Sequence, residues 1–158
     1  RLGDDINADY IIASTRKRDS LDETVLKRYL LETLDPAFAA SVLPGDLIVA
    51  GRNFGCGSAM EVAATVILAA GIKAVLAESF SRTFYRNAIN NGLVPVACDT
   101  RGIGEGDQLE VRLVSGVAEV RDVTSGVVVM GAPLPSIMLG ILEAGGLVAH
   151  VRAGIGSK

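Results

Sequence analysis

The chain has 158 residues, 49% of them hydrophobic, with 15 basic and 18 acidic residues and a net charge of −3. This size and apolar content suit a globular α/β protein, and we expect a single domain over residues 1–158. The small acidic charge argues against a nucleic-acid partner, which would need a clustered basic face. No apolar run approaches the ~20 residues that span a bilayer, and no signal peptide is visible. We therefore expect a cytoplasmic protein without a membrane partner.

The N-terminal third is predicted to contain short elements. Residues 10–13 are apolar and predict a short strand, which is followed by a polar, basic loop at 14–20. Apolar residues at three- and four-residue spacing predict a helix over 21–34. Residues 38–42 predict a short helical turn.

From residue 47, apolar segments and helical patterns alternate. Strands are predicted at 47–50, 73–78 and 93–98, and helices at 59–71 and 79–91. Each predicted helix ends at a glycine, Gly71 or Gly92, which is a typical C-terminal helix stop. Alternation of this kind indicates parallel strands joined by right-handed crossovers.

The pattern changes after residue 100. Short alternating segments with tight turns predict antiparallel strands at 108–113, 117–123 and 126–130. An apolar helix is predicted at 136–144, and the tail from residue 153 is expected to be frayed. The fold class is therefore α/β, with a parallel first part and an antiparallel second part.

Residues 51–61 form a Gly-rich loop with three glycines, at positions 51, 55 and 57. Glycines let a backbone turn sharply and approach a ligand closely. Ser58 followed three residues later by Glu61 is typical of a capping box at a helix start. A Gly-rich turn before a helix also suits an anion. Ser58 is thus either a structural cap or a hydroxyl tuned to lose its proton.

The two cysteines, Cys56 and Cys98, are too few for a disulfide framework or for an iron–sulfur cluster, which takes about three or four thiolates. The chain has one histidine, His150. We therefore expect no metal site and no cofactor in this chain, and Cys56 is expected to pack in the turn.

Three motifs carry a resemblance to a known family: Gly51-Arg-Asn-Phe-Gly-Cys-Gly-Ser58, the stretch 71–75, and Ser79 to Leu93. With the opening stretch 3–9, they resemble the small subunit of 3-isopropylmalate dehydratase. That subunit is homologous to the swivelling domain of aconitase and homoaconitase. The resemblance covers about residues 2–150 and implies a three-layer β/β/α swivelling domain.

The resemblance also implies an activity. Members of this family are hydro-lyases that dehydrate and rehydrate a small hydroxy-dicarboxylate, here 3-isopropylmalate in leucine biosynthesis. They act with a separate large subunit, which is expected to carry a [4Fe–4S] cluster whose open iron polarises the substrate hydroxyl as a Lewis acid.

The resemblance assigns roles to individual residues. Ser58 matches the catalytic base, a serine alkoxide stabilised by fixed donors. Asp9 matches an active-site aspartate, although an isolated aspartate before a strand is more often a solvated turn carboxylate. Arg16 and Arg18 lie in the loop that discriminates substrates, because a guanidinium binds carboxylate bidentately; a solvated basic loop is the alternative.

The chain departs from the family at one place. The usual Ser-Ser-Arg-Glu-His reads Ser58-Ala59-Met60-Glu61-Val62 here, so two carboxylate ligands are absent. Three explanations are open. The substrate could be less anionic where it faces Met60. Alternatively, one of Arg16, Arg18 and Arg52 could replace the missing arginine, or the usual activity could be lost. We assign Gly57, Ala59 and Met60, with Arg16 and Arg18, to substrate binding.

Several alternatives stay open. A paralogous enzyme could act on another malate derivative, such as citramalate, dimethylmalate or homoaconitate. A swivelling domain could also be a non-catalytic module that binds carboxylates or a partner, and the isolated chain could form a homo-oligomer. In the second helix motif, Arg82, Arg86 and Asn87 are expected to make structural pairs.

Overall fold

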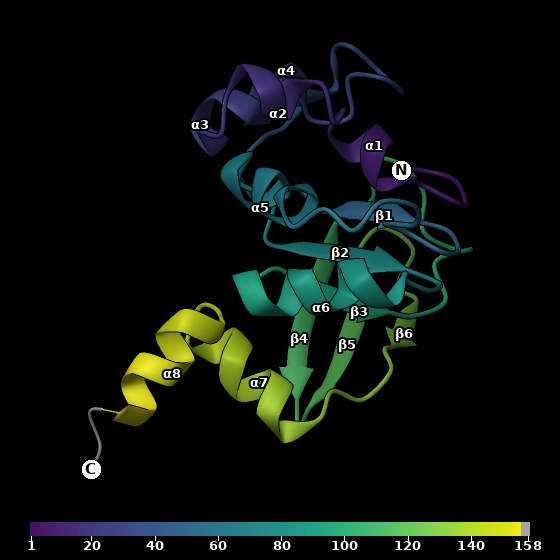
Figure 1. The fold of residues 1–158 in the computed structure, drawn as a ribbon. Coiled ribbons are helices and arrows are strands. Elements are labelled where there is room, and N and C mark those ends of the chain that lie inside the picture. Colours follow the sequence, from purple (N-terminus) through teal and green to yellow (C-terminus); the bar gives the residue numbers. More distant parts are fainter. Residues whose placement is uncertain (156–158) are drawn as a thin grey trace.

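The structure, a computed structural model, describes residues 1–155 and contains two three-stranded sheets with helices packed around them (Figure 1). The strands are β1 (Ile48–Ala50), β2 (Ala74–Ala77), β3 (Val94–Ala97), β4 (Leu109–Val114), β5 (Val117–Asp122) and β6 (Val128–Met130). The helices are α1 (Ala8–Ile11), α2 (Arg16–Asp19), α3 (Glu23–Leu26), the 3-10 helix η1 (Lys27–Tyr29), α4 (Phe38–Ser41), α5 (Val62–Ala69), α6 (Arg82–Asn91), α7 (Ser136–Glu143) and α8 (Leu147–Ile155).

The two sheets have the predicted polarity. β1, β2 and β3 are parallel and adjacent in that order, with Leu76 opposite Val49 on one side and Val96 on the other. β4, β5 and β6 form an antiparallel meander in which Val111 lies opposite Val120. The parallel first part and the antiparallel second part are therefore confirmed.

Side-chain alternation along β2 explains the three layers. Val75 and Ala77 belong to a core cluster that also contains buried residues of α1, α3 and α5. Leu76 belongs to a second cluster, with Ala118 and Val120 of β5. Because both faces of the parallel sheet are covered, its strands are wholly apolar. Each fully buried Val or Leu side chain contributes about 1.5–3 kcal/mol. The order antiparallel sheet, parallel sheet, helices is the predicted β/β/α arrangement.

Residues 10–13 were predicted as a strand, which is wrong: α1 covers Ala8–Ile11, and Ile12 follows it in an extended conformation. The side chain of Asn7 accepts a hydrogen bond from the Asp9 amide and so caps this helix. A run of four apolar residues fits a strand or a buried helical turn equally well. The cap decides between them.

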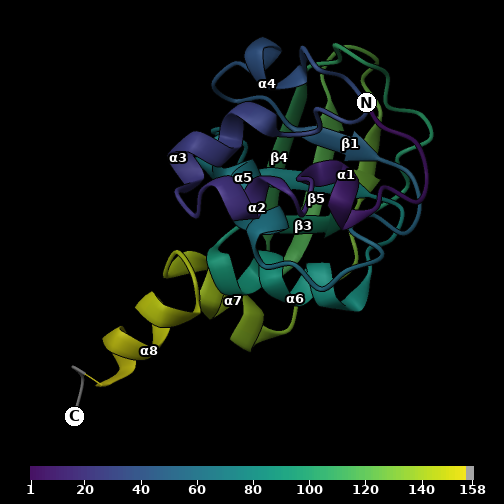
Figure 2. The ribbon, with the colours of Figure 1, turned by 45° about the horizontal axis from the view of Figure 1, so that its top comes forward.

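The helix predicted over 21–34 is shorter than expected. Helical structure ends with η1 at Tyr29, and Leu31 then has a left-handed backbone with a φ of 58°. Leu31 is fully buried, and its amide donates to the Ile11 carbonyl at 2.9 Å. Tertiary packing therefore ends the helix. Figure 2 shows α1, α2 and α3 on the side of the sheet that α5 also covers.

The C-terminal part forms two helices: α7 packs beside α6, and α8 extends away from the sheets (Figure 1). The chain turns by 95° between α7 and α8. Residues 153–155 are helical where we expected a frayed tail, and residues 156–158 lie outside the described part. No single helix in residues 1–155 is long and apolar enough to cross a membrane; by length and composition alone, the bent α7–α8 pair passes that test.

Candidate active site

The N-terminal segment runs beside the Gly-rich loop and so brings distant residues together. Residues 2–8 pair with residues 49–56: the Gly55 amide donates to the Ile6 carbonyl at 2.7 Å, and the Ala8 amide donates to the Cys56 carbonyl at 2.7 Å. Asn7 and Cys56 form a parallel bridge. Asp9 therefore lies next to the end of a loop that is almost fifty residues away in the chain.

The glycines of the loop let its backbone pack closely against other side chains of the same protein, where a ligand was expected. Gly57 has a φ of +83°, and a Cβ there would overlap the amide group of Asn7. Gly55 has a φ of +76°, and a Cβ there would overlap Phe84. Both positions require glycine, because the left-handed backbone strains other residues and the space is already filled.

Ser58 and Asp9 make the central contact of the site. Ser58 Oγ donates to Asp9 Oδ2 at 3.3 Å. This distance is long for a hydroxyl–carboxylate bond, as is common for catalytic pairs before substrate binds. Asp9 Oδ1 is buried and has no hydrogen-bond partner in the described part of the chain. A buried acceptor without a donor costs about 1–3 kcal/mol, so Asp9 is held in an unfavourable state for stability.

The predicted capping box is wrong. Helix α5 begins at Val62, its N-cap residue is Glu61, and no side chain caps it. The Ser58 carbonyl instead accepts the Met60 amide at 2.9 Å, and Glu61 accepts a hydrogen bond from Asn91 Nδ2. This turn separates Ser58 from the helix, so its hydroxyl is available to Asp9.

The tip of the loop presents backbone donors. Gly57, Ser58 and Ala59 are exposed, and within residues 1–155 their amides donate to no acceptor. Such unpaired amides suit a carboxylate or an oxyanion. Met60, by contrast, is 7% exposed and packs in the core on the helical side of the parallel sheet. The predicted substrate contacts of Gly57, Ala59 and Met60 stay predictions.

Arg16 and Arg18 were predicted to lie in a loop, but they belong to helix α2, and their surroundings differ. Arg16 pairs with Glu32 through two hydrogen bonds of 2.7 and 2.8 Å, and its guanidinium lies 4.0 Å from the centre of the Tyr29 ring. Arg18 is exposed, and its side chain has no partner in the described part of the chain. Arg16 is thus already engaged, whereas Arg18 is exposed and unpaired within the described residues.

Charged groups line the carboxyl edge of the parallel sheet beside the loop. Arg52 binds Asp4, and these hydrogen bonds lower the pKa of the Asp4 carboxyl. Arg101 binds Asp99 in the same way and lowers the pKa of Asp99 to about 2. Arg52, the third possible replacement for the missing arginine, is therefore paired.

Sequence reasoning missed two positioning residues, Asn7 and Ser81. Asn7 caps α1 and fills the space above Gly57. Ser81 caps α6, and its hydroxyl donates to the Gly55 carbonyl at 2.6 Å. Both are preferred N-cap residue types directly before a helix, which is the signal that could have identified them.

The described residues offer no donor set for a metal or a cluster. In residues 1–155, no group of three or more His, Cys, Asp or Glu side chains is placed so that it could hold a metal ion. Cys56 is half-buried in the loop, while Cys98 is buried, which raises the pKa of its thiol to about 11. These residues do not fit an iron–sulfur cluster, which needs several thiolates at one place.

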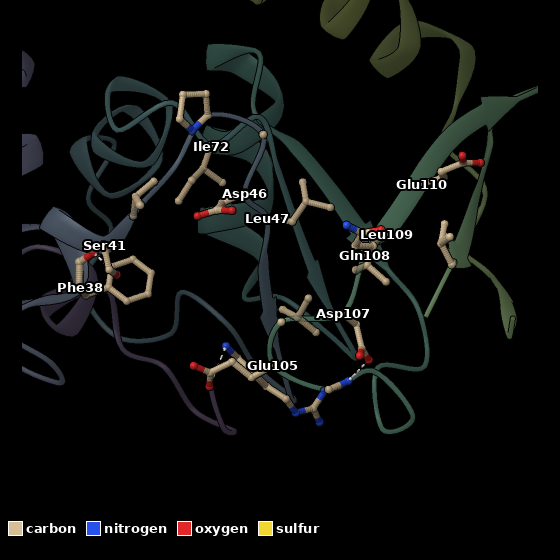
Figure 3. A pocket seen from close by; sticks show the side chains of 18 residues that line it. Phe38, Ser41, Asp46, Leu47, Ile72, Glu105, Asp107, Gln108, Leu109 and Glu110 are labelled. Atoms are coloured by element: carbon tan, nitrogen blue, oxygen red, sulfur yellow. Dashed lines mark hydrogen bonds and ion pairs between the residues drawn. The ribbon is translucent and has the colours of Figure 1, made fainter. Parts of the chain in front are cut away.

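A cavity of about 720 Å³ lies elsewhere, near the start of β1 (Figure 3). Asp46, Glu105 and Asp107 line it, but Asp46 accepts the Leu43 amide and Asp107 accepts the Gly104 amide. Its lining includes none of the predicted site residues. Asp46 and Asp107 thus hold turns, and the cavity does not belong to the Ser58 site.

Comparisons with known proteins agree on one family. The aconitase C-terminal domain family matches residues 12–101. The 3-isopropylmalate dehydratase small subunit 2 of Archaeoglobus fulgidus is 43% identical over 152 residues, which are 96% of this chain and 91% of that protein. The methanogen homoaconitase small subunit of Methanothermobacter thermautotrophicus is 46% identical over 151 residues, 95% of this chain and 86% of that protein.

A solved structure has the same fold. The crystal structure of 3-isopropylmalate dehydratase from Methanocaldococcus jannaschii superposes with a TM-score of 0.91 at 40% identity, covering 99% of this chain and 95% of that one. The three-layer architecture is thus that of this solved relative. The chain belongs to the aconitase C-terminal domain family.

Proposed function

We propose that this chain is the small subunit of a 3-isopropylmalate dehydratase-type hydro-lyase in the cytoplasm, and that it acts with a large subunit that carries a [4Fe–4S] cluster. The contact between Ser58 Oγ and Asp9 Oδ2 carries the proposal. It joins two segments of the chain at an exposed loop tip, in a family whose relatives are named dehydratase and isomerase small subunits.

The geometry supports a proton relay. Ser58 must lose its own proton before its oxygen can abstract a C–H proton from the substrate, and Asp9 Oδ2 is the acceptor at hand. The unpaired amides of Gly57, Ser58 and Ala59 supply fixed donors near the oxygen that becomes charged. The groups that activate the leaving hydroxyl belong to the large subunit in this proposal.

Among the basic residues, the geometry favours Arg18 as the ligand of a substrate carboxylate. Arg16 binds Glu32 and Arg52 binds Asp4, so either would have to break a bidentate pair first. Arg18 needs no such exchange, and it belongs to α2, the helix that directly follows α1, which carries Asp9. Arg18 of α2 would then replace the arginine that the family motif has at the position of Met60.

The proposal limits the substrate to one class, the hydroxy acids related to malate, but does not single out one member. One relative is named an isopropylmalate/citramalate isomerase small subunit and another a homoaconitase small subunit. A neighbouring malate derivative is therefore the second candidate, favoured by Ala59 and Met60 at two positions that hold carboxylate ligands in the family.

The test is anaerobic reconstitution with a large subunit of the same enzyme family from the same organism, followed by measuring the absorbance of the unsaturated product. The panel contains isopropylmalate, citramalate, dimethylmalate, homocitrate and citrate. We expect turnover of at least one acid, and its loss on Ser58→Ala. Ser41→Ala is the matched control, because Ser41 is exposed on α4 and outside the loop. A correctly assembled complex with an intact cluster and no turnover would instead favour the non-catalytic module.

A further inference from the structure

A groove of about 420 Å³ runs between α6 and α7. Its floor is apolar and includes Tyr85, Ile89 and Ile141, and Ile137 on its edge is 59% exposed. The groove has no part in the proton relay described above. An open apolar groove between two helices is a common docking site for an apolar segment of another chain.

Two arginines give the groove a charge. Arg82 and Arg86 are one helical turn apart on α6, and both line the groove. Both are exposed, and within residues 1–155 neither side chain has a hydrogen bond or an ion pair, so the predicted structural pairing is wrong. No acidic residue lines this groove. Its charge therefore complements a carboxylate-bearing partner.

One end of the groove is formed by Phe80, which packs against the Gly-rich loop. Phe80 lines the groove and also forms a bridge with Phe54, which lies in the Gly-rich loop. The rings of Phe54 and Phe80 pack edge to face, with centres 6.1 Å apart. Phe54 is buried, so Phe80 links the groove to the packing beneath the loop that carries Ser58.

We propose that this groove receives a segment of the large subunit, with apolar side chains on the floor and carboxylates beside Arg82 and Arg86. The inference rests on the proposed function, because it takes the large subunit as the chain that approaches Ser58. The segment would also press on Phe80 and so hold the loop in place. Assembly and the geometry of Ser58 are coupled by this contact.

Other occupants fit the groove less well. The most exposed apolar helix of a second copy is α8, but its described side chains include Arg152 and no carboxylate, so like charges would meet at Arg82 and Arg86. A small ligand would remain largely exposed beside Ile137, whereas ligand sites usually enclose most of their ligand.

The test measures the dissociation constant of the heteromer by calorimetry or sedimentation. We expect Arg82→Glu/Arg86→Glu to raise it by at least about tenfold and to weaken its dependence on salt. The control is Lys27→Glu/Arg28→Glu on η1, which changes the net charge equally at two exposed residues outside the groove. Ile137→Asp should weaken assembly as well, while Val148→Asp on α8, at 64% exposure, should not.

The outcomes separate this inference from the proposed function. A wild-type chain that binds the large subunit and turns over substrate, with unchanged affinity in the Arg82/Arg86 variant, overturns the groove alone. A wild-type chain that never binds overturns the proposed function. Self-association of the isolated chain that is lost only in the Arg82/Arg86 variant, with heteromer affinity unchanged, would assign the groove to a second copy and also overturn the inference.

Discussion

Replacing Gly57 by alanine tests whether the loop is held by its contact with Asn7. Gly57 and Gly106 have the same φ of +83°, but a Cβ at Gly57 would overlap the Asn7 amide, whereas nothing lies within 4 Å of one at Gly106. The left-handed backbone alone costs alanine about 1–2 kcal/mol at either position. At Gly57 the displaced Asn7 also uncaps α1, which adds about 1 kcal/mol.

The assay is urea unfolding of Gly57→Ala and Gly106→Ala, each with and without Asn7→Ala. We expect Gly57→Ala to lower the free energy of unfolding by about 2–3 kcal/mol and Gly106→Ala by about 1–2 kcal/mol. In the Asn7→Ala background this difference should disappear, because the overlapping atoms are gone. Equal losses at the two glycines, or strict additivity with Asn7→Ala, would refute the reasoning. Turnover should fall with Gly57→Ala only.

Three further predictions concern single side chains. Arg18→Ala should raise KM without changing the urea midpoint. Arg16→Ala should lower the free energy of unfolding by about 1–2 kcal/mol, because the pair with Glu32 is lost. A KM effect confined to Arg16→Ala would instead assign carboxylate binding to Arg16. Cys98 should resist thiol reagents at pH 8 until the protein unfolds. Its native pKa of about 11 lies above the ordinary 9.0, so its contribution to stability is full below pH 9 and is lost as the pH rises toward 11. Asp9→Asn should reduce turnover by about 10²–10⁴-fold without loss of stability, because Asp9 Oδ1 has no donor to lose in the described structure; marked destabilisation would contradict this.

The sheets could be predicted from the sequence because their signals are local. The strand over residues 74–77 is a fully buried apolar run, and Gly92 ends α6 in a left-handed conformation, as a helix-stopping glycine should. Such patterns depend on neighbours in the chain. The predicted elements are therefore found in the structure, because the core buries the same apolar residues that the local patterns identify.

The predictions that were wrong depend on distant contacts. A capping box needs only Ser58 and Glu61 in sequence, yet the turn at Met60 and the bond from Asn91 move the helix start to Val62. The predicted helix over 21–34 ends early because Leu31 is held by Ile11. The family resemblance places Ser58 and Asp9 in one active site. Their hydrogen bond, however, depends on the pairing of residues 2–8 with residues 49–56, which no local sequence pattern predicts.

The pairing of residues 2–8 with residues 49–56 also has a consequence for synthesis. These contacts span almost fifty residues, so residues 2–8 leave the ribosome well before residues 49–56, with which they pair. At about 5–20 residues per second, that delay lasts a few seconds. Until then the backbone groups of residues 2–8 lack these partners, and Asp9 lacks its contact with Ser58.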